Sequence, residues 1–446
     1  MEAVLPILLE NIVLITALLL GLLIVVPYIW MHNRHSTKMR AKQKEAVEFG
    51  LDEPVSIHPS VNRDKCIGSG ACIKACPEKE ILGTIDGKAE AVYASRCVGH
   101  GACARACPVG AIELVFGTER RGVDIPQVYP NFETNVERIF IAGELGGMGL
   151  IRNAMKQGRE AVEYIVEDLK KSEKLKEDNI YDLVIVGAGP AGLSASLQAK
   201  KEKLNFLTID QAEDFGGTIL TYPRAKLVMA NMIEIPVYGK VKKKEFSKEE
   251  LLELWNDIIA KTGIKVEANE KVENAEKVNG FYTIKTTKRE IKSRFILLGI
   301  GRRGTPRKLG VPGEKLPKVM YRLLEPEKFK NQNILIVGGG DSAVEAAVAL
   351  GAQEGTKVTL SYRKKVFGRI KPGNSERIID AKKSGHVELL MESNVKEIKP
   401  GSVVLDVKGE QKEIKNNSVF IFAGGELPNE FLKKLGIDIE TKFGTR

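Results

Sequence analysis

The stretch 181-YDLVIVGAGPAG-192 determines the fold expected for this chain. Its first part, Leu183 to Val186, is short, apolar and rich in β-branched residues, which predicts a buried strand. The G-x-G-x-x-G pattern that follows permits a tight turn, the approach of a pyrophosphate to the backbone, and close packing of a helix on the strand. Free N–H groups at the start of that helix favour phosphates. The residues expected at this site are Gly187, Gly189, Pro190, Ala191 and Gly192.

An acidic residue supports a dinucleotide site at this loop. A second predicted strand, Asn205 to Ile209, is followed directly by Asp210. A carboxylate at this place in a βαβ unit accepts hydrogen bonds from ribose hydroxyls. A glycine turn also occurs by chance in ordinary α/β domains, but the strand, the loop and the acid together favour a dinucleotide.

A second glycine loop lies further along the chain. The predicted strand Ile334 to Val337 leads into G-x-G-x-x-A, the pyridine-nucleotide form of the same phosphate-binding device. The next strand, Val358 to Ser361, runs into basic residues rather than an acid, and a basic group suits the 2′-phosphate of NADP. A solvated basic loop is the alternative, and Arg363 is our first choice of phosphate ligand. The predicted NADPH-binding residues are Gly338, Gly340, Asp341, Ser342, Ala343, Arg363 and Lys364.

All six cysteines lie in two short runs, Cys66-IGSGA-Cys72-IKA-Cys76-Pro77 and Cys97-VGHGA-Cys103-ARA-Cys107-Pro108. The second run repeats the first at an offset of 31 residues. Such crowding indicates metal or cluster ligation in a reducing compartment rather than a disulfide framework.

The runs resemble the two halves of a bacterial dicluster ferredoxin, whose pattern is C-x2-C-x2-C-x3-C-P. In that family the last cysteine of each run ligates the other cluster. The resemblance therefore implies two mixed ligand sets: Cys66, Cys72 and Cys107 for one cluster, and Cys97, Cys103 and Cys76 for the other.

The chain departs from the ferredoxin pattern at the second position of each run, where Ser69 and His100 replace cysteine. Each cluster then has three thiolates, which suffice for [3Fe–4S]. A [4Fe–4S] cluster needs the Ser69 oxygen, the His100 nitrogen or a solvent ligand, and the sequence leaves these alternatives open. Zinc is a further alternative, but the Cys-Pro endings and the paired spacing favour iron–sulfur clusters.

Residues 138–168, RIFIAGELGGMGLIRNAMKQGREAVEYIVED, resemble the element that closes the FAD site in thioredoxin-reductase-like flavoproteins. In those proteins it is a C-terminal strand, a Gly-Asp pair and a helix that faces the flavin; here the pair is Gly143 and Glu144. The element precedes the first glycine loop in this chain, which implies a circular permutation. A simple amphipathic helix after a strand leaves the glycines around Glu144 unexplained.

The same resemblance implies FAD and NADPH as cofactors, and Gly217 and Thr218 resemble the family's glycine turn near the flavin. It points to the ferredoxin–NADP reductase-like and bacillithiol-disulfide-reductase-like branch. Thioredoxin reductases carry a C-x-x-C dithiol shortly before the second loop, whereas residues 320–332 contain no cysteine. We therefore expect no dithiol relay.

The N-terminal region predicts a membrane anchor. Asn11 to Met31 carries no charged residue and is long enough to cross about 30 Å of hydrocarbon as a helix. The basic residues follow it, from Arg34 to Lys44, so the positive-inside rule places the N-terminus outside and the redox domains in the cytoplasm. A cleaved signal peptide would carry a basic segment before the apolar run, and a buried soluble helix would show a polar face.

The chain of 446 residues is too long for one core, and its net charge of +10 favours anionic lipid or an acidic partner. We expect no binding to nucleic acid, because no such motif is present. The expected fold is α/β, with two Rossmann-like domains after an α+β dicluster ferredoxin module and one transmembrane helix. The expected boundaries are 1–34 anchor, 35–56 basic linker, 57–118 ferredoxin, 119–178 permuted FAD-closing segment, 179–302 FAD domain, 303–415 NAD(P) domain and 416–446 return to the FAD domain.

The sequence thus predicts a single-pass inner-membrane oxidoreductase that passes electrons between NADPH, FAD and two clusters. The sequence does not identify the electron acceptor or donor that exchanges electrons with this chain: it is a quinone, a ferredoxin or a membrane redox protein. A homodimer is also possible. Hydride transfer needs no side-chain acid or base, so no catalytic residue is assigned. One alternative is an electron-relay or docking subunit of a membrane complex; a weaker one is a disulfide or polysulfide reductase that acts through the flavin.

Overall fold

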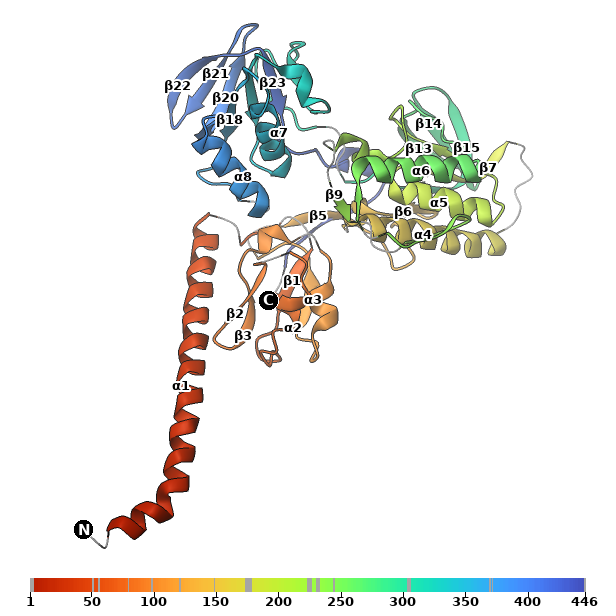
Figure 1. Ribbon diagram of the computed structural model, residues 1–446. Coiled ribbons are helices and arrows are strands. Elements are labelled where there is room, and N and C mark those ends of the chain that lie inside the picture. Colours follow the sequence, from red (N-terminus) through yellow and green to blue (C-terminus); the bar gives the residue numbers. More distant parts are fainter. Residues whose placement is uncertain are drawn as a thin grey trace. The chain divides into compact units, whose positions relative to one another are not determined.

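The computed structural model describes residues 4–49, 52–54, 57–78, 80–97, 99–119, 122–147, 149–172, 179–222, 227–229, 233–243, 245–302, 306–368, 370 and 372–444. The chain divides into two compact units, Met1–Val115 and Phe116–Gly444 (Figure 1). The division lies close to the expected end of the ferredoxin module at residue 118. The first unit carries the cysteines, and the second carries both glycine loops.

The first unit consists of a long N-terminal helix and a small module with an internal repeat. Strand β1 pairs antiparallel with β4, and β2 with β3. The short helices α2 and α3 each begin after a glycine in the left-handed region, Gly70 at φ +67° and Gly101 at φ +68°. The sequence repeat is therefore also a structural repeat. The elements are α1 (Val4–Phe49), β1 (His58–Val61), α2 (Ala71–Ala75), β2 (Leu82–Ile85), β3 (Lys88–Ala91), η1 (Ala94–Arg96), α3 (Ala102–Ala106) and β4 (Ile112–Val115).

Helix α1 corrects one expected boundary. It continues through Phe49, so the predicted linker 35–56 is wrong for residues 35–49. The Lys, Arg, Gln, Glu and Ala residues of this segment are good helix formers, and the segment packs on the module, with Ser36 and Ala46 buried. The part Thr16–Glu48 is long and apolar enough to cross a membrane, with a mean hydropathy of 1.6 in its most apolar window.

The larger sheet of the second unit has the strand order β13-β14-β15-β7-β8, and β6 also pairs with β15. Strands β6, β15, β7 and β8 are parallel, while β13 and β14 form an antiparallel hairpin. The segment before the first glycine loop therefore supplies a strand of this sheet. The elements are β6 (Ile139–Ile141), η2 (Glu144–Gly146), α4 (Ile151–Lys171), β7 (Ile180–Val186), α5 (Pro190–Lys201), β8 (Phe206–Ile209), β13 (Val272–Val278), β14 (Phe281–Thr286) and β15 (Glu290–Leu298).

Alternate residues of each strand point to opposite sides of this sheet. Both faces are buried, because other elements pack on each of them. Phe140, Leu183 and Phe295 pack with Ala154 and Ala191 under helices α4 and α5. Ile139, Val184 and Ile296 on the other face pack with the β14 hairpin and with α9 (Asn429–Lys434). Parallel strands covered on both faces read as continuous apolar runs, as the strand before the first glycine loop does.

The second sheet is fully parallel, in the order β16-β23-β17-β18-β19, and carries a separate antiparallel sheet β20-β21-β22. Strand β23 corrects another boundary: residues 418–421 belong to this sheet, so the chain returns to the first domain only after them and not at 416. The elements are β16 (Val319–Met320), η4 (Pro326–Phe329), β17 (Asn333–Val337), α7 (Asp341–Gly351), β18 (Lys357–Tyr362), α8 (Pro372–Lys383), β19 (Val387–Met391), β20 (Ser393–Ile398), β21 (Ser402–Val407), β22 (Glu410–Lys415) and β23 (Ser418–Ile421).

The remaining elements of the second unit are short except for one helix. Helix α6 (Lys248–Thr262) begins with a capping box between Ser247 and Glu250. Strand β24 (Ile439–Lys442), near the end of the chain, pairs antiparallel with β5 (Val123–Pro126). The others are η3 (Gly217–Thr221), β9 (Leu227–Met229), β10 (Ile233–Ile235), β11 (Gly239–Val241) and β12 (Glu245–Ser247).

Candidate functional site: two glycine loops and two cysteine groups

The first glycine loop joins β7 to α5 and packs tightly against the end of β15. Gly187 has φ +101°, and a Cβ there would lie 2.7 Å from the carbonyl oxygen of Gly299. A Cβ on Gly192 would lie 1.7 Å from the carbonyl oxygen of Gly187. Both positions therefore require glycine, the first for the turn and the second for the packing of α5 on β7.

Gly189 lies at the open side of the same loop. It is the N-cap of α5, with φ −75°. Beyond its chain neighbours, the nearest described atom to a Cβ built there is the Cα of Gly217, at 3.8 Å. Gly217 itself lies in the left-handed region at φ +58°, at the start of η3 and next to Thr218. The backbone at Gly189 is therefore not closely covered by the described residues, and a pyrophosphate at this helix N-terminus remains a prediction.

Asp210 lies directly after β8 and holds the loop. Its Oδ2 accepts a hydrogen bond from the Ala188 N–H at 2.5 Å, and its Oδ1 accepts one from the Ala212 N–H at 2.8 Å. The residue is only 9% exposed. The carboxylate therefore shapes the turn, a task that the sequence did not reveal, and its expected bond to a ribose remains a prediction.

The Gly143–Glu144 turn lies beside this loop, although it comes earlier in the chain. A Cβ on Gly143 would lie 3.1 Å from the Cβ of Ala191 in the first turn of α5. The Gly143 N–H donates a hydrogen bond to Gln157 Oε1 on α4 at 2.8 Å. Burial lowers the pKa of Arg302, while the neighbouring Glu144 carboxylate opposes this decrease. The Gly143–Glu144 turn and the first glycine loop therefore lie side by side in the structure.

The second glycine loop joins β17 to α7. Gly338 has φ +149°, and a Cβ there would lie 2.6 Å from the carbonyl oxygen of Phe422. Ala343, the last residue of the pattern, is fully buried. Gly340 is the N-cap of α7, and no atom of the described residues beyond its chain neighbours lies within 4 Å of a Cβ built there. A phosphate at this helix N-terminus also remains a prediction.

Tyr362, at the end of β18, packs over this loop. A Cβ on Gly339 would lie 2.2 Å from the Tyr362 ring, so the middle residue of the loop must be glycine. The ring stacks on Phe367 with their centroids 5.6 Å apart. Arg363 and Lys364 follow Tyr362 and are exposed. Their role at a 2′-phosphate remains a prediction.

Two acids lie on the first turns of α7, after the glycines. Asn374 of α8, 5% exposed, donates hydrogen bonds to Asp341 Oδ1 at 2.7 Å and to Glu345 Oε1 at 3.0 Å. Ser342 follows Asp341 in the same turn. Asn374 therefore orients two carboxylates near the expected phosphates, and no local sequence pattern pointed to it.

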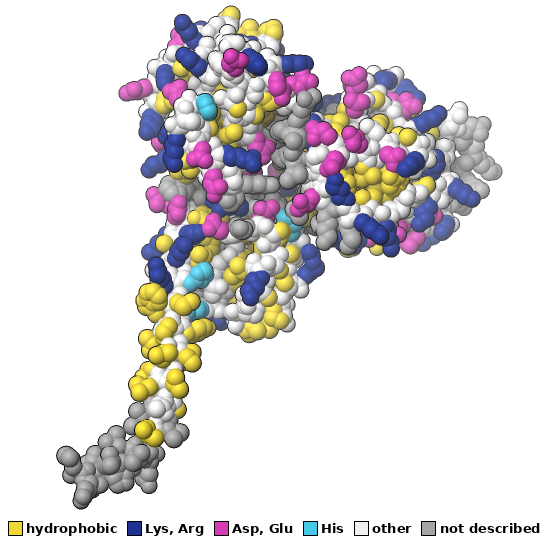
Figure 2. Space-filling view, in the orientation of Figure 1, with side chains coloured by type: hydrophobic (Ala, Val, Ile, Leu, Met, Phe, Trp, Pro, Cys, Tyr) yellow, Lys and Arg dark blue, Asp and Glu magenta, His cyan; other side chains and the backbone are white. Residues whose placement is uncertain are grey.

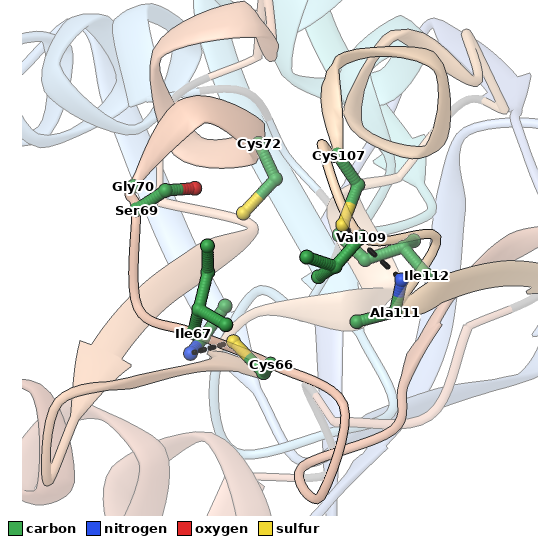
Figure 3. Close-up of a pocket in the computed structure, with 10 residues that line it drawn as sticks. Cys66, Ile67, Ser69, Gly70, Cys72, Cys107, Val109, Ala111 and Ile112 are labelled. Carbon is green, nitrogen blue, oxygen red and sulfur yellow. Dashed lines mark hydrogen bonds between the residues drawn. The ribbon is translucent and has the colours of Figure 1, made fainter.

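The first cysteine group lines a cavity formed by both runs (Figure 3). Cys66 and Cys72 come from the first run and Cys107 from the second, and their sulfur atoms face the same space. The Ala89 N–H donates to Cys66 Sγ at 3.4 Å, and the Ala111 N–H donates to Cys107 Sγ at 3.2 Å. Such bonds stabilise thiolates at iron–sulfur clusters, so the structure brings together the set that the resemblance implied.

The second group combines Cys97 and Cys103 with Cys76 of the first run. Burial raises the pKa of the Cys97 thiol to about 11, and the neighbouring thiols of Cys103 and Cys76 contribute to this increase. Burial likewise raises the pKa of Cys76, with a further contribution from Cys103. Thiols in such surroundings become ligands when metal binding displaces the proton.

The two replaced cysteine positions differ in what the structure shows. The Ser69 side chain belongs to the lining of the first cavity, and its hydroxyl points toward the space that the sulfur atoms face (Figure 3). The carbonyl oxygen of His100 accepts a hydrogen bond from Arg105 at 3.1 Å.

Several residues at these sites lay beyond the reach of sequence patterns. Gly158 of α4 would place a Cβ 2.1 Å from the carbonyl oxygen of Ala191, so it sets the close approach of α4 to α5. Gly68 and Gly99, both at positive φ, pack against Gly87 and Ile57. Gly68 and Gly99 occupy the same position in the two cysteine runs, and this repetition is the one sequence signal that could have identified them.

Known proteins resemble both units. Residues 184–444 match the model of the pyridine nucleotide-disulphide oxidoreductase family, and residues 58–108 match that of a 4Fe-4S dicluster domain. The chain is 30% identical over 271 residues to a ferredoxin–NADP reductase of Ignicoccus hospitalis, which covers 58% of this chain and 83% of that protein. It is 27% identical over 269 residues to a bacilliredoxin reductase of Bacillus subtilis, covering 58% and 82% of the two chains.

A solved structure also resembles a large part of this chain. The bacillithiol disulfide reductase from Staphylococcus aureus superimposes with a TM-score of 0.53 at 29% identity, covering 59% of this chain and 82% of that one. The segment 138–168 lies outside the range matched by the family model, although β6 belongs to the same sheet. With both glycine loops inside the matched range, the chain belongs to the pyridine nucleotide-disulphide oxidoreductase family and is an FAD-dependent pyridine-nucleotide oxidoreductase joined to an iron–sulfur dicluster domain.

Proposed function

We propose that this chain is a membrane-anchored oxidoreductase that passes electrons between NADPH, FAD, two iron–sulfur clusters and an acceptor or donor at the membrane. The observation that carries the proposal is the presence of two dinucleotide loops and two mixed cysteine groups in one chain. Bound FAD supplies the conversion between a hydride, which carries two electrons, and the one-electron chemistry of clusters.

The residues divide this task between them. The open N-terminus of α5 at Gly189 binds the FAD pyrophosphate, and the Asp210 carboxylate, which already accepts the Ala188 N–H, retains acceptor capacity for a ribose hydroxyl. The N-terminus of α7 at Gly340 binds the phosphates of the nicotinamide coenzyme. The exposed Arg363 and Lys364 select NADPH over NADH through its 2′-phosphate.

The FAD site is closed by a segment that has moved in the chain order. Strand β6, η2 and α4 precede β7, yet β6 pairs with the same β15 that pairs with β7. Gly143 and Glu144 lie beside the first turn of α5, where they contact the same flavin nucleotide as Gly189. This arrangement supports a circular permutation of the domain.

The cluster sites follow the mixed ligand sets, with Cys76 serving the second site. Ser69 would supply the fourth ligand of the first cluster, and His100 that of the second. His100 is the better iron ligand of the two, because a neutral imidazole is a common ligand type, so the second site retains four irons more readily. Iron analysis and EPR of Ser69→Cys and His100→Ala test this. Spectra and iron contents identical to wild type in both variants would contradict it.

The membrane location rests on α1. Its segment before Arg34 exposes apolar side chains along its whole described surface, including Leu18, Leu22 and Ile24 (Figure 2). Basic residues follow this segment and precede the cysteines. We assign the N-terminus to the outside and both redox units to the cytoplasm.

Anaerobic reduction of the purified, full-length protein tests the proposed function. NADPH is expected to bleach the flavin and then produce the EPR signals of reduced clusters. Flavin that NADPH does not reduce would contradict the proposal and favour an electron-relay subunit. Rapid turnover with disulfides, with clusters that stay oxidised, would favour a disulfide reductase.

A further inference from the structure

The C-terminal half of α1 packs along the ferredoxin module through a series of contacts. The turn of the β2–β3 hairpin lies beside His32, since a Cβ on Gly87 would lie 3.8 Å from His32 Nε2. The Asp86 carboxylate accepts hydrogen bonds from Ser36 and Arg40 one and two turns later. From His32 to Ala46 the helix rises by about 20 Å, at 1.5 Å per residue.

The next turns of α1 contact the other end of the hairpin. Lys42 and Arg96 form ion pairs with Glu80, and Gln43 donates to Glu90 at 2.9 Å. Ala46 is fully buried with Val92 and Tyr93. These contacts, spread along α1 from His32 to Ala46, fix the position of the module along the helix axis. They thereby fix its distance from the apolar segment, which ends near Met31 (Figure 1).

The two cysteine groups attach to different levels of this helix. In the loop of the first group, a Cβ on Gly68 would lie 2.0 Å from the carbonyl oxygen of Gly87, and Gly87 is the residue beside His32. The second group attaches through Cys97, which directly follows η1 and its Arg96–Glu80–Lys42 contacts. Lys42 is about 15 Å further along α1 than His32. The first group is therefore tied to the level nearest the apolar segment.

Exposed apolar side chains lie over this first group. Ile67 follows Cys66 and is 67% exposed, and Val109 follows Cys107-Pro108 and is 40% exposed. Both line the cavity that Cys66, Cys72 and Cys107 form (Figure 3). Two apolar side chains from separate runs thus meet at the one cluster site that lies close to the bilayer end of α1.

We propose that the Cys66/Cys72/Cys107 site is the port through which electrons reach a lipid-soluble quinone at the bilayer surface. The inference rests on the proposed function and names the partner of that site. Ile67 and Val109 contact the apolar carrier, and the packing of α1 holds the site at its level. One quinone accepts two electrons, delivered singly from the cluster and derived from NADPH, and takes up two protons from water to give the hydroquinone.

The test uses the full-length protein in phosphatidylcholine–phosphatidylglycerol vesicles that contain decylubiquinone. Ile67→Asp places a charge at the port and is expected to lower quinone reduction at least tenfold, and Val109→Asp by a smaller factor. Val278→Asp is the matched control, because Val278 is an exposed valine, 42% accessible, on the β13–β14 hairpin of the other unit. In Val278→Asp, ferricyanide reduction and the NADPH-reduced EPR signals are expected to stay unchanged. In Ile67→Asp and Val109→Asp, NADPH is still expected to produce the EPR signals of both reduced clusters, so that the loss is specific to the quinone.

A second variant tests the height of the site without touching it. Seven helix-forming residues inserted after Met31 raise the module by about 10 Å and nearly preserve the face that α1 presents. Quinone reduction is expected to fall at least tenfold, whereas ferricyanide reduction persists. Unchanged quinone reduction in the insertion variant or in Ile67→Asp would overturn the inference.

The outcomes also separate this inference from the proposed function. Clusters that NADPH reduces in a wild-type protein that does not reduce the quinone would overturn the port and leave the function intact. Reduction of a soluble ferredoxin in place of the quinone, impaired by Ile67→Asp, would assign the port to a protein partner and also overturn the inference. Clusters that NADPH does not reduce would contradict the proposed function itself.

Discussion

The two glycine loops follow almost the same pattern but differ in their surroundings. Other segments of the chain lie beside the first loop. The Cα of Gly217 lies 3.8 Å from a Cβ built on Gly189, and the Asp210 carboxylate accepts a hydrogen bond from the Ala188 N–H. Over the second, no described atom beyond the chain neighbours lies within 4 Å of a Cβ on Gly340. The residues after the second strand are exposed and basic.

This difference corresponds to two kinds of occupant. A loop with another segment of the chain beside it suits a resident cofactor, which that segment helps to retain. An open loop with exposed basic side chains suits a coenzyme that binds and leaves in each turnover. The shared pattern supplies the phosphate site, and the segments around it determine how long the ligand stays.

The largest expected effect is the loss of flavin in Gly189→Val. Gly189 has a negative φ, and a Cβ there makes only an ordinary contact, so the fold should persist while the side chain fills the pyrophosphate space. The purified variant should release no FAD on denaturation, with an unchanged circular dichroism spectrum. A folded Gly189→Val protein with a full complement of FAD would refute the assignment of this loop.

Gly340→Val should separate the two loops. The position also has a negative φ and free space, so the variant should fold and retain its flavin. Flavin reduction by NADPH and by NADH should both fall below detection in stopped-flow measurements, while chemical reduction by dithionite continues. Loss of flavin in this variant would show that the second loop does not act independently of the first.

The comparison also shows what sequence patterns can and cannot predict. Both loops were identifiable because glycine requirements are local: Gly187 and Gly338 need positive φ, and Gly192 meets the backbone a few residues away. Gln157 and Asn374 were not identifiable, because a polar residue on a helix reveals nothing of a partner that only the tertiary fold brings near. Such partners depend on packing and not on periodicity.

The two boundary corrections have the same origin. The composition of residues 35–49 suits a solvated linker and an exposed helix equally well, and packing on the β2–β3 hairpin decides between them. Strand β23 is a short apolar run that suits either parallel sheet, and only its pairing with β16 and β17 assigns it to the second. For the cysteines, the resemblance to dicluster ferredoxins implied mixed ligand sets, and the structure places Cys66, Cys72 and Cys107 around one cavity; their role as cluster ligands remains a prediction.

Arg363→Ala should have an intermediate effect that is specific for one coenzyme. Loss of a charge-assisted contact with the 2′-phosphate costs about 1.5–3 kcal/mol, or roughly 10- to 150-fold in KM for NADPH. KM for NADH should stay nearly unchanged, which steady-state kinetics with both coenzymes measures. Equal weakening for the two coenzymes would exclude a role at the 2′-phosphate, and Lys364→Ala then becomes the next variant to compare.

The smallest expected effect is that of Asn374→Ala, which alters the second loop without removing a ligand. Asn374 donates hydrogen bonds to Asp341 and Glu345, and its loss removes one hydrogen bond from each of these carboxylates, near the expected phosphates of the coenzyme. Their repulsion should raise KM for NADPH and NADH by about the same factor, roughly 3- to 10-fold for a hydrogen bond worth about 1 kcal/mol. The flavin content should not change, because Asn374 and its two partners belong to the second glycine loop and its neighbouring helices α7 and α8. Asn374→Asp, which adds a third carboxylate, should raise both KM values further. A change confined to NADPH would instead connect Asn374 to the 2′-phosphate, and an unchanged KM in both variants would show that Asp341 lies away from the bound phosphates.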